Sequence, residues 1–221
     1  MINRKQKQHL PPSSEAGFTL IEALLAIIVV TIMMIAISPA IILSVATRVQ
    51  AKRVELGTAA AQTYIDGVRS GAIDDPEVSP TTLDNVDAPT GGSLSCQDPL
   101  SQGRKSFYCT SPPGLYCIDN DDDGCTSDSF KDMIIQPSAY NPTSTEVDKG
   151  YQLGIRVYRA DAFKDASPLL KKSDNNTKAE ASTFSGGAGD RKAPLVEMTT
   201  EIATSKTKYG DLCERQGGCG N

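Results

Sequence analysis

Three acidic residues near the middle of the chain have a spacing that suits a cation. Asp119, Asp121 and Asp123 alternate within the segment CIDNDDDGC, and Gly124 follows them. This D-x-D-x-D-G pattern is the first half of an EF-hand-type loop, in which alternating carboxylates converge on one hard cation. The second half is missing, because Phe130 stands where such a loop has its final Glu. We therefore expect a shorter, non-helical calcium loop, or else an acidic surface turn made of good turn formers.

The cysteines form an even set that lies entirely after residue 95. They are Cys96, Cys109, Cys117, Cys125, Cys213 and Cys219. Such a set is typical of structural disulfides formed in an oxidising compartment, and the chain has no CxxC redox pair. Proximity favours pairing neighbours in chain order, so that Cys117 and Cys125 close around the acids. Sequence alone does not fix this connectivity.

Histidine usage excludes the catalytic mechanisms that need a histidine in the body of the chain. The only histidine, His9, lies close to the N-terminus, so the body of the chain has no His base, relay or zinc ligand. A glycosidase would need only carboxylates, but nothing marks two acids for that role. The formal net charge is −5, and no Lys/Arg-rich block follows residue 47, which argues against nucleic-acid binding. We predict that the chain is not an enzyme.

A long apolar segment near the N-terminus precedes the acidic residues and the cysteines. From Phe18 to Thr47, Glu22 is the only ionisable residue. The 25 residues after Glu22 would rise about 37 Å as a helix, enough to span a membrane. An acid in the bilayer core costs roughly 2.5–3.5 kcal/mol, so Glu22 needs a partner and a function. We expect a single membrane-spanning helix.

A basic leader precedes this apolar segment and ends on a small residue, Gly17. A secretory signal peptide would instead be cut after its apolar centre. A cut before the apolar segment would leave the helix as the new N-terminus, beginning at Phe18. The freed α-ammonium group would then be available to Glu22 of the same or a neighbouring subunit.

At these residues the chain resembles the class III prepilin leaders shared by type IV pilins and type II secretion pseudopilins. The resemblance lies in GFTLIE and in Pro39. It implies that prepilin peptidase cleaves after Gly17 and methylates Phe18, and that Glu22 helps to register subunits in a filament. It implies that Pro39 kinks or melts the helix. The implied partners are prepilin peptidase, other pilin or pseudopilin subunits and an inner-membrane assembly platform.

The organisation expected from sequence is a long N-terminal helix packed on a small antiparallel β-sheet head with disulfide-rich loops, an α+β class. Helical periodicity continues beyond the apolar segment to Gly71, a credible stop signal. The expected parts are a removed leader at 1–17, a transmembrane part at 18–47, a stalk helix at 48–71 and an extracytoplasmic head at 72–221.

Alternating apolar residues predict strands in the head. The segments at 132–136 and 151–158 have strand character, and the residues between them supply a turn, so an antiparallel pair is expected. A further strand is expected within 194–203.

Further segments resemble one pseudopilin subfamily in particular. SPAIILSVATRVQAKRVE, CIDNDDDGC, DMIIQ and YQLGIRVYRADAF are similar to the cyanobacterial hormogonium polysaccharide secretion pseudopilins, the family labelled B. This resemblance implies a minor pseudopilin of a type IV pilus-like apparatus that supports polysaccharide export and gliding motility. It would be a single-pass inner-membrane protein with a periplasmic head, reaching a filament or the cell surface after assembly.

Two other functions remain open at this point. A type II secretion minor pseudopilin would share the architecture but serve the export of folded proteins. A bitopic membrane-anchored adhesin or receptor with a calcium-stabilised domain would keep its leader uncleaved.

Overall fold

The computed structural model describes residues 19–92, 94–96, 106–171 and 190–218 of the 221-residue chain. The chain divides into two units, Met1–Ser44 and Val45–Asn221. The predicted leader, including the cleavage residues Gly17 and Phe18, lies outside the described residues. The finer domain limits expected from sequence stay predictions.

Helix α1 runs over Leu20–Ser70 and contributes to both units. It begins after Thr19, whose carbonyl and side-chain hydroxyl oxygens accept the Glu22 N–H at 3.0 and 3.4 Å. A Thr followed three residues later by a Glu is a helix-start signature. Gly71 ends the helix with a φ of 71°, the left-handed conformation that glycine adopts readily. The stop predicted there is confirmed.

The helix stays continuous through Pro39. A proline inside a helix has no N–H to donate to the preceding turn, and its ring crowds that turn. The expected melting at Pro39 is not seen, and the alternative of a kink stays a prediction. Pro39 still leaves one hydrogen bond of the helix unmade.

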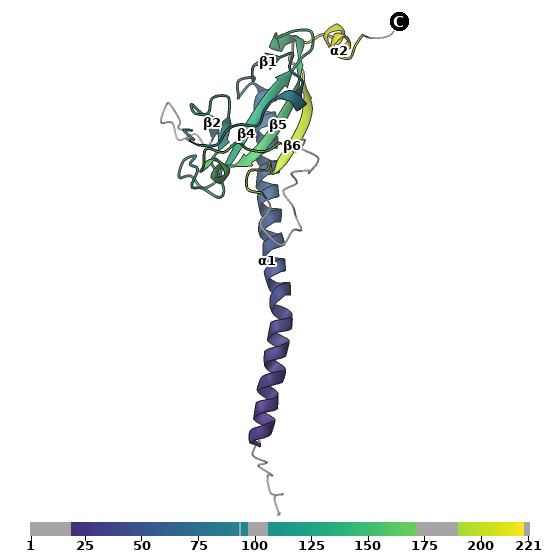
Figure 1. The fold of residues 1–221 in the computed structure, drawn as a ribbon. Helices are drawn as coiled ribbons and strands as arrows, with labels where there is room; N and C mark the ends of the chain where they lie inside the picture. The colour runs from purple at the N-terminus through teal and green to yellow at the C-terminus, as the bar shows by residue number, and fades with distance from the viewer. Residues whose placement is uncertain (1–18, 93, 97–105, 172–189, 219–221) are drawn as a thin grey trace, which may run out of the picture. The chain divides into compact units, whose positions relative to one another are not determined.

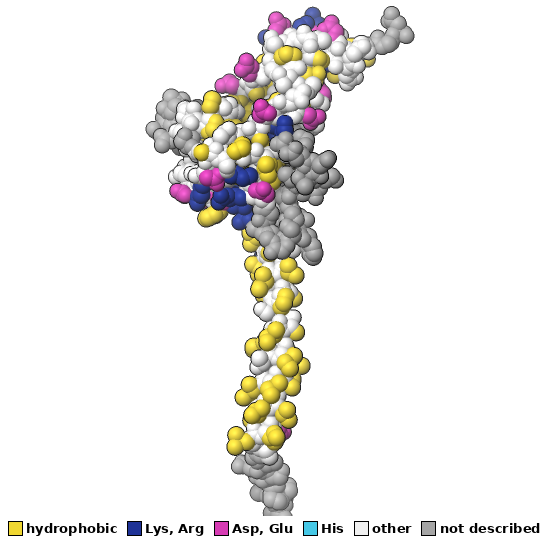
Figure 2. Space-filling view, viewed as in Figure 1, with side chains coloured by type: hydrophobic (Ala, Val, Ile, Leu, Met, Phe, Trp, Pro, Cys, Tyr) yellow, Lys and Arg dark blue, Asp and Glu magenta, His cyan; other side chains and the backbone are white. Residues whose placement is uncertain are grey.

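In the first unit, α1 is hydrophobic around its whole circumference. Large apolar side chains from Leu20 to Leu43 are exposed, and Figure 2 shows apolar side chains along the face of the helix in view. Among the described residues, α1 is the one helix long and apolar enough to cross a membrane. A helix that is apolar all round needs lipid or other helices as its surroundings. With the N-terminal pattern, this supports a single-pass membrane anchor.

The second unit contains a six-stranded sheet with the strand order β2-β3-β4-β5-β6. These five strands are antiparallel to their neighbours, and the central β4 and β5 lie side by side in Figure 1. Strand β1 instead pairs in parallel with the end of β4 that β3 does not reach. The strands are β1 Val78–Ser79, β2 Ser106–Tyr108, β3 Tyr116–Ile118, β4 Met133–Tyr140, β5 Tyr151–Arg159 and β6 Val196–Ile202.

Short helical elements connect the strands. They are the 3₁₀ turns η1 Leu83–Asn85, η2 Val147–Lys149 and η3 Ala160–Phe163. Helix α2, Tyr209–Arg215, follows the last strand.

One face of the sheet packs against the second half of α1. Alternate residues of β5, including Leu153 and Val157, are fully buried in a core with Ala61 and Tyr64 of α1. Gly57 lets the helix approach closely, because a Cβ there would stand 3.3 Å from the Cβ of Leu195. The apolar stripe of α1 and the alternation of β5 therefore meet in one core.

A second, smaller core lies on the opposite face, around two disulfides. Cys96 is bonded to Cys109 and Cys117 to Cys125, the two pairs that proximity favoured. Cys96 and Cys125 also form a backbone bridge, so the two disulfides adjoin. Ile134, Tyr158 and Phe163 complete this cluster, which we name the disulfide core.

Cys213 also forms a disulfide. Cys219, the partner expected for it, lies outside the described residues.

The antiparallel pair predicted from sequence is confirmed as β4 with β5, and the third predicted strand is β6. Strand β4 extends to Tyr140, four residues beyond the predicted end at Gln136, because its later residues pair with β5 and β1. The short strands β2 and β3 and helix α2 were not predicted. They are too short to carry a clear periodicity.

We predict that Val157→Ala lowers the free energy of unfolding by about 2–3 kcal/mol, because it removes two buried methyl groups and leaves a cavity. Val157 is fully buried between α1 and the sheet. Denaturant unfolding of the detergent-solubilised chain measures this change.

The matched control is Val49→Ala on α1, where the side chain is 44% exposed. This variant should change stability by less than about 0.5 kcal/mol. Equal effects of the two variants would contradict the placement of the core.

Candidate functional site

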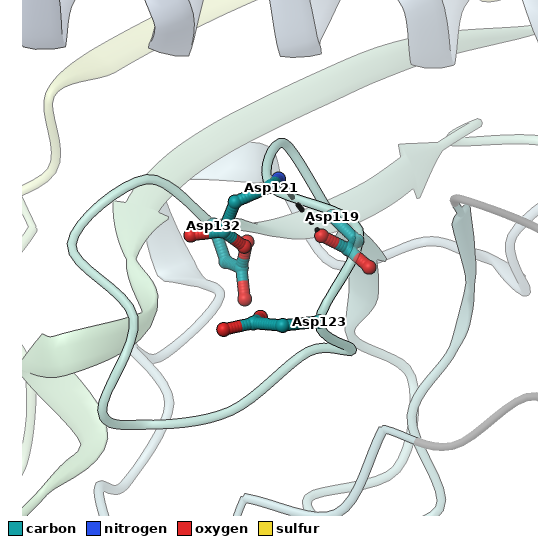
Figure 3. A group of neighbouring side chains, drawn as sticks. All are labelled: Asp119, Asp121, Asp123 and Asp132. Carbon is teal, nitrogen blue, oxygen red and sulfur yellow. Dashed lines mark hydrogen bonds between the residues drawn. The ribbon is translucent and has the colours of Figure 1, made fainter.

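The predicted acidic residues lie in the loop that joins β3 to β4. Asp119 follows the last residue of β3, and the Cys117–Cys125 disulfide closes the first part of the loop. The carboxylates of Asp119, Asp121 and Asp123 come together with a fourth, that of Asp132. One oxygen from each lies within 4.8 Å of the others (Figure 3). We name these four residues the acidic cluster.

Asp119 organises the backbone of the loop. Its Oδ1 accepts the N–H groups of Asp121 and Asp122 at 3.0 and 2.8 Å, and its Oδ2 accepts that of Gly124 at 2.9 Å. Burial opposes its negative charge, but these backbone hydrogen bonds outweigh it and hold the pKa of Asp119 below the usual range. The turn is tight enough to place Asp122 at a φ of 64°. Asp119 is thus an ionised group around which the turn folds.

Asp132 lies outside the D-x-D-x-D-G motif, and the structure adds it to the cluster. Because β3 and β4 pair with Ile118 opposite Met133, Asp119 and Asp132 are the next residues outward on the two strands. The antiparallel register therefore brings together acids that are 13 residues apart. Only the pairing of β3 with β4 places Asp132 in the cluster, and the spacing of residues in the sequence does not reveal that pairing.

The environment of Asp132 disfavours a negative charge. The residue is fully buried. Burial is the main cause that raises its pKa, to about 6, and the charges of Asp121 and Asp119 add to it. Backbone N–H groups of Asn120 and Thr126 at 3.2 and 3.3 Å act in the opposite direction. A nearby cation would relieve this unfavourable charge.

Asp121 and Asp123 complete the cluster. The Oδ1 of Asp121 is buried and has no hydrogen-bond partner among the described residues. Its Oδ2 accepts the Ser129 hydroxyl at 3.3 Å and lies 3.8 Å from the Lys131 ammonium. A hydrogen bond with Asp121 raises the pKa of Asp123. In Figure 3 the side chains of Asp121, Asp123 and Asp132 point toward one another.

This geometry fits a hard cation with oxygen ligands. Oxygens bound to Ca²⁺ at 2.3–2.6 Å stand at most about 5 Å apart across the ion. The acidic cluster satisfies this limit with a largest separation of 4.8 Å. The buried Oδ1 of Asp121 without a hydrogen bond and the buried Asp132 are the groups that a cation would satisfy.

Glu22 is the other predicted site residue that the structure describes. It lies exposed in the first turn of α1. An acid there interacts favourably with the positive end of the helix dipole. Glu22 is thus compatible with the start of the helix, and its predicted pairing with a freed N-terminus at Phe18 stays a prediction.

Comparison with known proteins bears on this N-terminal region. Residues 12–38 match the family model described as the prokaryotic N-terminal methylation motif. The chain carries a prepilin-type N-terminus. The motif implies processing by prepilin peptidase and supports a type IV pilin or pseudopilin subunit, in keeping with the long helix and antiparallel sheet. No curated protein and no solved structure matches the chain significantly.

We predict that Asp119→Ala, measured without calcium, lowers the free energy of unfolding by about 2–3 kcal/mol. The reason is that three backbone N–H groups of the turn lose their acceptor. Chemical denaturation in the presence of a chelator measures the effect.

Asp123→Ala is the matched control in the same loop. Under the same conditions it should change stability little or raise it, because Asp123 is exposed and its charge adds to those of Asp121 and Asp119. A loss of stability as large as that of Asp119→Ala would show that Asp119 has no special role in the turn.

Proposed function

We propose that the chain is a minor pseudopilin, a structural subunit of a type IV pilus-like apparatus that supports hormogonium polysaccharide secretion and gliding motility. The observation that carries the subunit role is the methylation motif at residues 12–38, which continues directly into the apolar part of α1. The polysaccharide role is supported by a sequence resemblance. The segments CIDNDDDGC, DMIIQ and YQLGIRVYRADAF resemble the hormogonium polysaccharide secretion pseudopilins.

In this proposal the two units have different tasks. Cleavage after Gly17 leaves a methylated Phe18, and its ammonium group pairs with Glu22 of a neighbouring subunit to set the axial register. The apolar side chains from Leu20 to Leu43, exposed in the single chain, are covered by lipid before assembly and by neighbouring helices afterwards. The inner-membrane assembly platform extracts the subunit, and the head remains outside the cytoplasm.

Calcium is proposed as a structural ligand of the head. Asp119, Asp121, Asp123 and Asp132 would each supply a carboxylate oxygen, and Asp119 would also hold the backbone of the loop in place. The ion would neutralise a group of acids that otherwise repel one another. It would thereby rigidify the loop between β3 and β4 against the forces of extraction.

The type II secretion alternative rests on the same N-terminal motif and differs in the exported cargo. Neighbouring genes distinguish the two functions: polysaccharide genes support the first, and a complete secretion operon supports the second.

We predict that the chain purified from its own membranes begins at N-methylated Phe18 and that Glu22→Ala keeps this processing. Filament incorporation of Glu22→Ala should fall roughly tenfold or more, because the loss of about 1.4 kcal/mol of pairing energy is already a tenfold change. Intact mass, N-terminal sequencing and quantification of sheared filaments measure these effects.

Ser38→Ala, on the same exposed part of α1, is the control and should be incorporated normally. A mature protein that starts at Met1 would exclude the pseudopilin function and favour an uncleaved adhesin or receptor. Normal incorporation of Glu22→Ala would overturn only the pairing role of Glu22.

We predict that calcium raises the thermal midpoint of the wild-type chain by several degrees, since a ligand that binds only the folded state stabilises it. The shift should disappear in Asp123→Ala and persist in Asp122→Ala, whose carboxylate is not in the acidic cluster. Melting curves with calcium and with chelator measure both effects. Equal midpoints for the wild type in the two conditions would rule out calcium as a stabilising ligand.

A further inference from the structure

The sheet face that points away from α1 is only partly covered. Because Leu153, Ile155 and Val157 face α1, their neighbours on β5 point to the opposite side. The disulfide core covers the end of this face near Ile134 and Tyr158. Beyond it, the paired strands present three successive rows: Gln136, Arg156 and Glu197; Ser138, Gly154 and Thr199; Tyr140, Gln152 and Glu201.

The first of two hollows lies over the middle row. It has a volume of about 250 Å³ and is bounded by Leu83 and by Arg156. Gly154 lets the Leu83 side chain lie close to the sheet at the edge of this hollow, since a Cβ there would stand only 3.0 Å from that side chain. Arg156 fixes the wall by donating to the carbonyls of Leu83 and Val86 at 3.0 and 2.8 Å. These hydrogen bonds hold the segment that contains η1 against β5.

The second hollow lies over the third row, where α2 forms the wall. It has a volume of about 230 Å³ and is lined by Tyr140, Gln152 and Arg215, among others. The Arg215 side chain is only 7% exposed and lies 2.6 Å from Glu201. Its Nε is buried and has no hydrogen-bond partner among the described residues. An acceptor oxygen of a ligand would satisfy this N–H group.

The arginine and the glutamate that line each hollow lie close to one another, and the exposed Asp84 is a further acid at the first hollow. Arg156 lies 3.5 Å from Glu197, and Arg215 is paired with Glu201. An anionic ligand would meet the glutamates, and a cationic ligand would meet the arginines. The lining therefore favours an uncharged ligand.

The remaining polar side chains are free to bind such a ligand. In the described part of the chain, the side chains of Ser138, Gln152 and Thr199 make no hydrogen bond, and each is at least partly exposed. Tyr140 adds an aromatic ring with a polar tip. Hydroxyls and an amide that can both donate and accept, beside an aromatic ring, match the hydroxyl groups and C–H faces of a sugar.

The spacing of the rows suits a chain of sugars rather than a single one. Side chains two residues apart on a strand are about 7 Å apart and point to the same side. The two hollows occupy adjacent rows of this kind. A repeating ligand can thus occupy both.

We propose that these paired hollows bind a neutral oligosaccharide chain, with Gln152 and Thr199 donating and accepting hydrogen bonds between η1 and α2. This inference deepens the proposed function and rests on it in one respect, that the head lies outside the cytoplasm, where a glycan is encountered. The binding site itself uses only residues of the second unit.

Calorimetric titration of the full chain in detergent micelles tests the inference. The probes are three neutral hexasaccharides, cellohexaose, maltohexaose and laminarihexaose, together with hexagalacturonic acid as an anionic comparison. At least one neutral probe should bind, and the double variant Gln152→Ala, Thr199→Ala should bind it roughly tenfold more weakly. The matched control replaces the same residue types on the exposed side of α1, Gln62→Ala with Thr63→Ala, and should leave binding unchanged.

Several results would overturn the inference. They are no binding of any neutral probe, tighter binding of the anionic probe, or equal weakening by the control variant. If the wild type binds no probe and Gln152→Trp blocks filament incorporation, the hollows are a contact between subunits instead. N-terminal processing and incorporation of the double variant are measured in parallel, so that failure of the subunit role is distinguished from failure of glycan binding.

Discussion

The packing of α1 against one face of the antiparallel sheet is the contact on which the second unit depends. The helix contributes small residues such as Gly57 and Ala61 as well as the fully buried Tyr64, and the sheet contributes alternate residues of β4, β5 and β6. Because this one layer of helix buries one face of the sheet, the opposite face is available for other purposes. The disulfide core, the acidic cluster and the paired hollows all use strands whose position α1 fixes.

The acidic cluster shows how a loop can hold groups that repel one another. The Cys117–Cys125 disulfide and the three hydrogen bonds to Asp119 hold the chain in a tight turn. The register of β3 and β4 then places Asp132 beside it. The fold thus supplies the geometry, and a bound cation would relieve the repulsion among the carboxylates.

Sequence predicted those features that depend on local pattern. The long helix, its stop at Gly71 and the pairing of β4 with β5 follow from periodicity and turn residues. Asp119, Asp121 and Asp123 were visible as a motif. Asp132, strands β2 and β3 and the hollows between η1 and α2 were not, because they arise when segments distant in sequence are brought together. Pro39 was expected to kink or melt the helix, and α1 is not melted there.

The Cys117–Cys125 disulfide also sets the order of export and folding of the acidic loop. In the proposed topology, Cys117 and Cys125 meet an oxidising environment only after the head has crossed the membrane. The covalent link that holds the loop between β3 and β4 in shape is therefore made late, on the far side of the bilayer. A chain retained in the cytoplasm would keep both thiols reduced, so maturation of the head reports that export has taken place.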